Sequence, residues 1–278
     1  MMAISTPKLP KLGAAMNIGE IAHFQDFLFE TDRDLEIQDF IGTDVLDGNF
    51  DNAVKRLKKA LEGYGGRLSL HGPFKGFSIY CKDELIMEAV RARISKCLDA
   101  VEAVGATQMV LHSPYSFWAA QNDQILNGYV NKMVEQTAGL LEPLVKRAHD
   151  IGCVIVIENI EDPDPEFRKT LIDMIDSPAL KASLDTGHAH CSIGIQADSA
   201  TSQQHIDGLG NRLVHMHLHD NYTDGDWHHI PGQGNIEWEV VFDSIKNLTA
   251  PPRLILELRD RKELAKAAQY LIDKGLCV

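Results

Sequence analysis

Short apolar runs alternate with longer amphipathic stretches along the whole chain, and this alternation constrains the fold more than any other feature of the sequence. Eight runs are rich in Val, Ile and Leu, and several are bounded by Gly, Pro or Asn, as β-strands are. The predicted strands span Lys11–Ile18, Asp34–Phe40, Arg67–Gly72, Gln108–Ser113, Cys153–Asn159, Lys181–Thr186, Leu213–Asp220 and Arg253–Leu258.

Helical periodicity fills most of the segments between these strands. The predicted helices span Phe50–Tyr64, Asp83–Val104, Asn131–Ile151, Pro165–Ile175, Trp238–Leu248 and Arg261–Lys274. Eight strands that alternate with about eight helices predict an α/β fold, a (β/α)8 TIM barrel. A doubly wound open sheet is the alternative, and it is less favoured because no Gly-rich phosphate-binding turn follows the first strand.

Composition places the chain among soluble globular proteins. Hydrophobic residues make up 44% of it, enough for a large core, and no apolar run approaches the roughly 20 residues that a bilayer requires. No linker divides the chain, so residues 1–278 are predicted to form one domain. The start, MMAISTPKLPKLGAAMNI, lacks the pattern of a signal peptide. The 5 cysteines include no C-x-x-C pair, so we expect a cytoplasmic protein whose cysteines are mostly core residues.

The net charge of the chain indicates which class of molecule the protein binds. Lys and Arg number 27 against 40 Asp and Glu, and 27 − 40 gives a net charge of −13. Nucleic-acid binding through bulk charge requires a basic surface, so the acidic balance makes a nucleic-acid partner unfavourable. We expect a small-molecule partner and no membrane.

Six consecutive predicted strands end on a side chain that can bind a metal, at the barrel end where TIM-barrel active sites form. In chain order these side chains are His71, His112, Glu158, Asp185, His217 and Glu257. The segments after the sixth and seventh strands add His188, Asp226 and His228. A single histidine is more often a packed, hydrogen-bonded residue than a ligand, and we interpret His23, His149 and His205 in that way. Six potential ligands at one topological position predict a metal site instead.

Strand alternation refines this geometry, because residues two apart share a face. His215, His217 and His219 should therefore point into the barrel, with His215 deepest and structural, His217 at ligand height and His219 near the rim. Glu158 closes the apolar run VIVIE, where an uncompensated carboxylate is costly. The most economical single site consists of Glu158, Asp185, His217 and Glu257.

This ligand set contains oxygen and nitrogen but no thiolate, so it suits a divalent metal such as Mn, Co, Mg, Fe or Zn. No organic cofactor is predicted. The remaining candidates either bind further metals or orient a polyol substrate; they are His71, His112, His188, Asp226 and His228. Phe74, Trp118 and Trp227 are candidate apolar walls of a substrate pocket. Arg259 is a candidate for binding a substrate carboxylate or phosphate, with a structural salt bridge as the alternative.

The ordered motifs HGPF, VLHSP, VIVIEN, SLDTGHAH, HMHLHDN, HHIPGQGNIEW and LILELRD resemble the xylose-isomerase-like TIM barrels over essentially the whole chain. That superfamily includes sugar epimerases, isomerases and dehydratases, and also the endonuclease IV enzymes of DNA repair. The resemblance implies shared divalent-metal ligands at Glu158, Asp185, His217 and Glu257. It further implies that Glu158 and Glu257 act as the acid–base pair that moves a proton beside a metal-bound carbonyl.

The endonuclease IV branch supplies the alternative function. Its trinuclear zinc pattern, which serves phosphodiester hydrolysis at abasic sites in DNA, would carry over onto all nine potential ligands. Two departures separate the branches. The Asp-Arg pair that epimerases of free ketoses usually carry is here Asp226-Trp227, and the early loops IGEIAHFQDF and QDFIGTDVLDGNF contain no Arg or Lys.

We therefore predict a metal-dependent isomerase or epimerase of a sugar, sugar phosphate or cyclitol. The zinc phosphodiesterase remains the second hypothesis, and a barrel that binds a ligand without turnover remains the third. The resemblance also leaves a homo-oligomer open.

Overall fold

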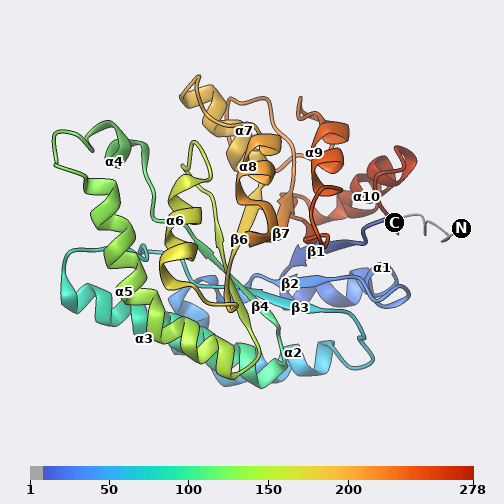
Figure 1. Cartoon of the computed structure of the whole chain (residues 1–278). Coiled ribbons are helices and arrows are strands. Elements are labelled where there is room, and N and C mark those ends of the chain that lie inside the picture. Colours follow the sequence, from blue (N-terminus) through green and yellow to red (C-terminus); the bar gives the residue numbers. More distant parts are fainter. Residues whose placement is uncertain (1–8) are drawn as a thin grey trace, which may run out of the picture.

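The computed structural model describes residues 9–278, in which eight parallel strands form a closed barrel (Figure 1). Each strand pairs with its neighbours in sequence, and β8 closes the barrel by pairing with β1. The strands are β1 (Leu12–Met16), β2 (Leu35–Ile37), β3 (Leu68–His71), β4 (Gln108–His112), β5 (Val154–Glu158), β6 (Leu180–Asp185), β7 (Leu213–Leu218) and β8 (Arg253–Leu256). The predicted (β/α)8 barrel is confirmed. Residues 1–8 lie outside the described residues. They begin the predicted single domain and also the segment predicted to lack the pattern of a signal peptide.

Helices surround this barrel. They are α1 (Gln25–Phe29), α2 (Phe50–Ala60), α3 (Glu84–Val104), α4 (Phe117–Gln121), α5 (Tyr129–Asp150), α6 (Glu166–Ile175), α7 (Thr186–Ile195), α8 (Ser202–Leu209), α9 (Trp238–Ile245) and α10 (Leu264–Asp273). Segments of 3-10 or π helix are η1 (Ile18–Phe24), η2 (Asp39–Ile41), η3 (Asp44–Gly48), η4 (Gly210–Arg212) and η5 (Arg261–Glu263). All six predicted helices are present, and α1, α4, α7 and α8 are additional. Among the described residues, no helix is long and apolar enough to cross a membrane.

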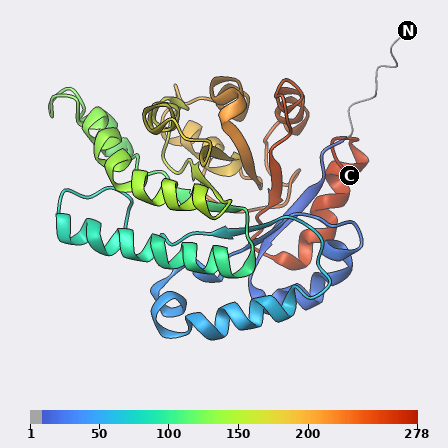
Figure 2. The ribbon, with the colours of Figure 1, turned by 60° about the horizontal axis from the view of Figure 1, so that its bottom comes forward.

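The periodic apolar residues of the long helices face the barrel. In α3, Val90, Ile94 and Leu98 are all buried, as their four-residue spacing predicts. Figure 2 shows α3 beside α5 on the outside of the molecule. Arg147 of α5 joins the two helices, because its guanidinium donates to Ser95 Oγ at 2.7 Å.

Most strands end before the predicted boundary, because the residues at their carboxyl ends leave the barrel to build loops. β2 stops at Ile37, and the next residues form the turn η2. β7 stops at Leu218, since Asp220 pairs in an isolated antiparallel bridge with His229 of the following loop. Glu257, which follows β8, is therefore outside its strand, whereas Glu158 and Asp185 are the last residues of β5 and β6.

Helix α7 was not predicted because it begins without a loop, directly after β6. The Asp185 carboxylate caps it by accepting the N–H of His188 at 2.7 Å. A Cβ at Gly187 would overlap the ring of His219, so only glycine allows α7 to pass this close to the end of β7.

The five cysteines are free. Cys97, Cys153 and Cys277 are buried, as expected, while Cys81 and Cys191 are only half-buried.

Candidate metal centre

Four side chains from successive strand ends converge in the mouth of the barrel. They are Glu158 at the end of β5, Asp185 at the end of β6, His217 in β7 and Glu257 directly after β8. Their potential ligand atoms all lie within 4.8 Å of one another. His217 Nδ1 lies 2.9 Å from Glu158 Oε1 and 3.4 Å from Glu257 Oε2. The structure thus brings together the four residues that the sequence selected as the central site.

The charges of this central group call for a cation. Glu158, Asp185 and His217 are buried, and Glu257 is 8% exposed. Burial opposes a charge on His217, but the carboxylates of Glu257, Glu36 and Glu158 outweigh burial and raise its pKa well above the usual value. One imidazolium balances only one of three buried carboxylates, and buried charges are stable only when they are paired. A divalent cation therefore fits the charge and the chemistry of these ligands.

Glu36 of β2 belongs to this site although the sequence analysis missed it. It is fully buried, and its two carboxylate oxygens lie 2.9 Å from His217 Nε2 and 3.0 Å from His215 Nε2. Because the Glu36 carboxylate accepts a hydrogen bond from His217 Nε2, a neutral His217 carries its proton on Nε2. Its Nδ1 lone pair then faces the other three candidate ligands. The sequence signal was a glutamate inside the apolar run LEI, the same signature that identified Glu158.

His71 and His112 flank the central group on one side. The Oε2 atom of Glu158 is buried without a hydrogen bond, 3.6 Å from His71 Nε2 and 3.5 Å from His112 Nε2. His71 donates from Nδ1 to the Gly72 carbonyl at 3.0 Å, so in its neutral form Nε2 carries a lone pair, 3.3 Å from His112 Nε2. Burial lowers the pKa of His112 to about 3, and its ring stacks on Phe74 at 4.1 Å. An orphaned carboxylate oxygen that faces two imidazole nitrogens is a fitting second metal position.

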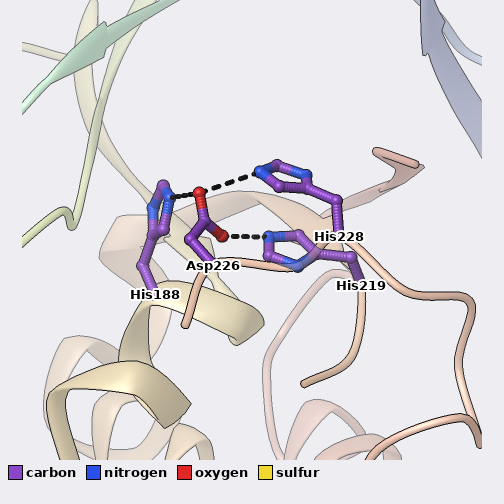
Figure 3. Close-up of side chains that lie close together, drawn as sticks. All are labelled: His188, His219, Asp226 and His228. Atoms are coloured by element: carbon purple, nitrogen blue, oxygen red, sulfur yellow. Dashed lines mark hydrogen bonds and ion pairs between the residues drawn. The ribbon is translucent and has the colours of Figure 1, made fainter. Parts of the chain in front are cut away.

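A third group lies on the other side of the mouth and consists of His188, His219, Asp226 and His228 (Figure 3). Asp226 Oδ2 lies 3.4 Å from His188 Nε2 and 3.1 Å from His228 Nε2. His188 and His228 both place Nδ1 2.9 Å from a backbone carbonyl, of Asn159 and Glu257 respectively. A carbonyl only accepts, so in the neutral rings Nδ1 carries the proton and Nε2 is free to bind a metal.

The ring of His219 completes this third group from behind. It lies just beyond the end of β7 and is fully buried, because it stacks on His228 at 3.8 Å and bonds Asp185 through Nε2 at 2.9 Å. His215 is the deepest of these three histidines, and it contacts Glu36 and, at 2.8 Å, Ser183 Oγ. The predicted order of depth therefore agrees with the structure, because His215 and His217 lie within β7 and His219 lies just beyond its carboxyl end.

The third group also holds charge. Burial opposes protonation of His228, but Asp226 and the carboxylates behind it outweigh burial and raise its pKa to about 9. Burial opposes the charge of Asp226 as well, yet His188 and His228 lower its pKa well below the ordinary range. Protons on these rings thus occupy the positions at which a metal would bind.

A cavity of about 400 Å³ opens over these groups. Its lining includes the predicted Phe74 and Arg259, together with Gln38 and Arg261, which the sequence analysis missed. The two tryptophans predicted as walls are not part of this lining.

Both tryptophans have other packing partners. Trp118 is 59% exposed on α4 and packs edge-on against Tyr129, 5.9 Å away. Trp227 stacks on His229 at 5.8 Å and lines a smaller neighbouring cavity. Aromatic residue type alone does not distinguish such packing from substrate contact.

A barrel with a ligand-rich mouth at the carboxyl ends of its strands defines a TIM-barrel protein with a candidate metal centre. The chain belongs to the xylose isomerase-like TIM barrel family, whose model matches residues 33–274.

Three individual proteins illustrate the similarity. An uncharacterized protein of Methanocaldococcus jannaschii is 24% identical over 224 residues, which cover 78% of this chain and 73% of that protein. The crystal structure of a D-tagatose 3-epimerase-like protein superposes with a TM-score of 0.77 at 20% identity, over 96% of this chain and 98% of the other. A Thermus thermophilus protein soaked with zinc chloride superposes with a TM-score of 0.69 at 20% identity, over 95% and 99% of the two chains. At these identities the structural likeness establishes the fold.

Proposed function

We propose that the protein is a divalent-metal-dependent isomerase or epimerase of a sugar or a related polyol. The observation that carries the proposal is the convergence of Glu158, Asp185, His217 and Glu257 within 4.8 Å under a cavity of monosaccharide size. The D-tagatose 3-epimerase-like protein with the same fold supports it.

The proposed chemistry is a proton transfer beside a carbonyl. A divalent cation held by the four ligands would polarise a substrate carbonyl and the neighbouring hydroxyl, which acidifies the C–H bond between them. Glu158 and Glu257 approach His217 Nδ1 from different strands, β5 and the end of β8. One carboxylate takes the proton and the other returns it, and two carboxylates on opposite sides of the substrate permit inversion at that carbon.

Hydrogen–deuterium exchange tests the proposal directly. The protein loaded with Mn²⁺ is incubated with candidate ketoses in D₂O, and exchange at the carbon beside the carbonyl is measured. Glu158→Gln and Glu257→Gln should abolish exchange, whereas Glu166→Gln, an exposed residue of α6 paired with Lys169, should not. Exchange that survives both site substitutions would refute the assigned acid–base pair.

One observation favours a second candidate, hydrolysis of a phosphoester at a multinuclear zinc site. The His71–His112 pair and the His188–Asp226–His228 group flank the central ligands, and in the neutral forms of His71, His188 and His228 the Nε2 atom is unprotonated. Three adjacent metals could bind a phosphate and activate water.

The metal content distinguishes the two candidates. One Mn or Co per chain favours the isomerase, and three zinc ions favour the hydrolase. Cleavage of an oligonucleotide with an abasic site by the zinc-loaded protein would then establish the DNA-repair activity, and no cleavage at high enzyme excess would dispose of it. The acidic early loops, which lack Arg and Lys over residues 18–27 and 38–50, favour the small-molecule reaction.

A further inference from the structure

Two arginines stand at the edge of the cavity, and their guanidinium groups contact neutral partners. Arg259 and Arg261 both line the cavity, from the segment that follows β8. The Arg259 guanidinium lies 5.9 Å from the centre of the Trp227 ring. The Arg261 guanidinium donates to the side-chain oxygen of Gln38 at 2.5 Å and to the Arg259 carbonyl at 3.4 Å. The chain has a net charge of −13, so two guanidinium groups with neutral partners beside this cavity need an explanation.

The Nε atom of Arg261 strengthens the case. It is buried and has no hydrogen-bond partner. A buried N–H without an acceptor is costly, and native structures rarely leave one unsatisfied. A guanidinium is the protein group best shaped to bind phosphate oxygens in pairs, so an oxyanion in the cavity that draws the Arg261 side chain towards it would also give Nε an acceptor.

Gln38 places this cation close to the reaction centre. Its side-chain oxygen accepts from Arg261, so its amide nitrogen must donate, and it donates to Glu257 Oε1. The guanidinium is therefore separated by one amide group from a carboxylate of the proposed acid–base pair. An anion bound by Arg261 would lie within a few bonds of the substrate's reacting carbons.

We propose that Arg261, assisted by Arg259, forms a phosphate-recognition subsite, and that the substrate carries its phosphate near the reacting carbons. Two cations match the charge of a phosphomonoester, about −1.5 to −2 at pH 7. The inference rests on the proposed function, because it assigns the second group of the same substrate. The phosphate belongs either to a sugar monoester or to a phosphodiester, and the experiment separates these sources.

Calorimetric binding to the chelator-treated, full-length protein tests the subsite without turnover and without metal–phosphate contacts. The titrants are D-fructose, D-fructose 1-phosphate, inorganic phosphate and bis(4-nitrophenyl) phosphate. We expect D-fructose 1-phosphate to bind about 10- to 100-fold more tightly than D-fructose, the range of a charge-assisted hydrogen-bond pair. Arg261→Gln should reduce this ratio to about 2 or less.

Two further variants control the measurement. Arg259→Gln, at an exposed position, should lower the ratio less strongly and guards against misfolding of the Arg261 variant. Arg212→Gln, which removes a surface guanidinium paired with Asp173 at 2.6 Å, should leave the ratio unchanged. A diester that binds more tightly than the monoester through the same arginines would uphold the subsite and assign the phosphate to a phosphodiester.

Equal binding of D-fructose and its 1-phosphate, or a preference that survives both cavity substitutions, would overturn the inference. So would a parallel loss of D-fructose binding in Arg261→Gln, because Arg261 would then only position Gln38. Deuterium exchange into a neutral ketose by a protein without phosphate preference would leave the proposed isomerase standing and refute this subsite alone. Phosphate preference without deuterium exchange would uphold this subsite and refute the proposed isomerase.

Discussion

Glu36 shows how one side chain orients a candidate ligand. It lies beneath the candidate metal centre and is fully buried. Its Oε1 atom lies 2.9 Å from His217 Nε2. Burial opposes its charge, but His217 and His215 outweigh burial and lower its pKa well below the ordinary range. A carboxylate behind a metal-binding histidine fixes the tautomer and strengthens the ring as a ligand.

Substitution of Glu36 should therefore weaken metal binding without removing a ligand. We expect Glu36→Gln to lower the affinity for Mn²⁺ or Zn²⁺ by about 10- to 100-fold. Competition with a metal indicator measures the affinity, and the matched control is Glu135→Gln at an exposed position of α5. Unchanged affinity in a folded Glu36 variant would contradict the assigned role.

Protonated histidines make metal binding depend on pH. The pKa of His228 is raised to about 9, and those of His188 and His217 are also raised, because surrounding carboxylates outweigh burial. The sign follows directly: these rings hold protons at pH 7, and a metal must displace them. Apparent metal affinity should rise as the pH increases from 7 to about 9.

Calorimetry in buffers of different ionisation enthalpy counts the protons released by each metal ion. Release should be positive at pH 7 and should decline above pH 9. His228→Gln should reduce it, whereas His149→Gln, which removes an exposed histidine of α5, should not. Metal binding without proton release at pH 7 would show that the rings are neutral.

At the scale of elements, the loop between β7 and α9 carries Asp226 and His228, and Asp220 holds that loop. The buried Asp220 carboxylate accepts the backbone N–H of Gly232 at 2.8 Å and of Ile236 at 3.2 Å. It also accepts Trp238 Nε1–H at 2.9 Å, at the start of α9. Much of the motif HHIPGQGNIEW therefore serves to close the loop rather than to contact a substrate.

Loss of the Asp220 carboxylate should release this loop. Asp220→Asn turns one acceptor into a donor among N–H groups, so we expect the free energy of unfolding to fall by about 2–4 kcal/mol. Metal bound at the third group should be lost before metal at the central group. Denaturant unfolding and metal analysis measure both effects, and Asp224→Asn, in the same loop but exposed, is the control. A stability change no larger than that of the control would be evidence against this role.

At the scale of the whole molecule, the barrel concentrates acidic residues at one end. Glu158, Asp185, Asp226 and Glu257 all belong to the candidate ligand groups. Part of the net charge of −13 is therefore expected to be neutralised by bound cations. Repulsion among buried carboxylates opposes folding, and a cation that binds only the folded chain stabilises it.

Metal should accordingly raise thermal stability. A metal concentration 100-fold above the dissociation constant adds about 2.7 kcal/mol, which corresponds to a rise in Tm of roughly 5 °C for a chain of this size. Scanning calorimetry of the chelated and Mn²⁺-loaded protein measures the shift. Glu158→Gln should abolish most of it, and an equal shift in that variant would place the stabilising ion elsewhere.

The order of elements and the central site were predictable because both depend on local signals. Strand and helix periods can be read within a few residues, and in a barrel every strand ends at the same rim, so Glu158 and Glu257 had to approach each other although 99 positions separate them (257 − 158). Strand ends were predicted too late, because the turn at Asp39 and the bridge at Asp220 depend on hydrogen bonds to other segments.

The sequence by itself determined the barrel, the height of the ligands at its mouth and the absence of thiolates among them, because periodicity and residue chemistry are local properties. Only the tertiary structure decided which ring nitrogen faces the candidate metal centre, that Glu36 stands behind His217, that the tryptophans lie outside the cavity and that Arg261 reaches Gln38. Those facts depend on which backbone carbonyls and side chains meet across strands, and the closure of the barrel alone brings them together.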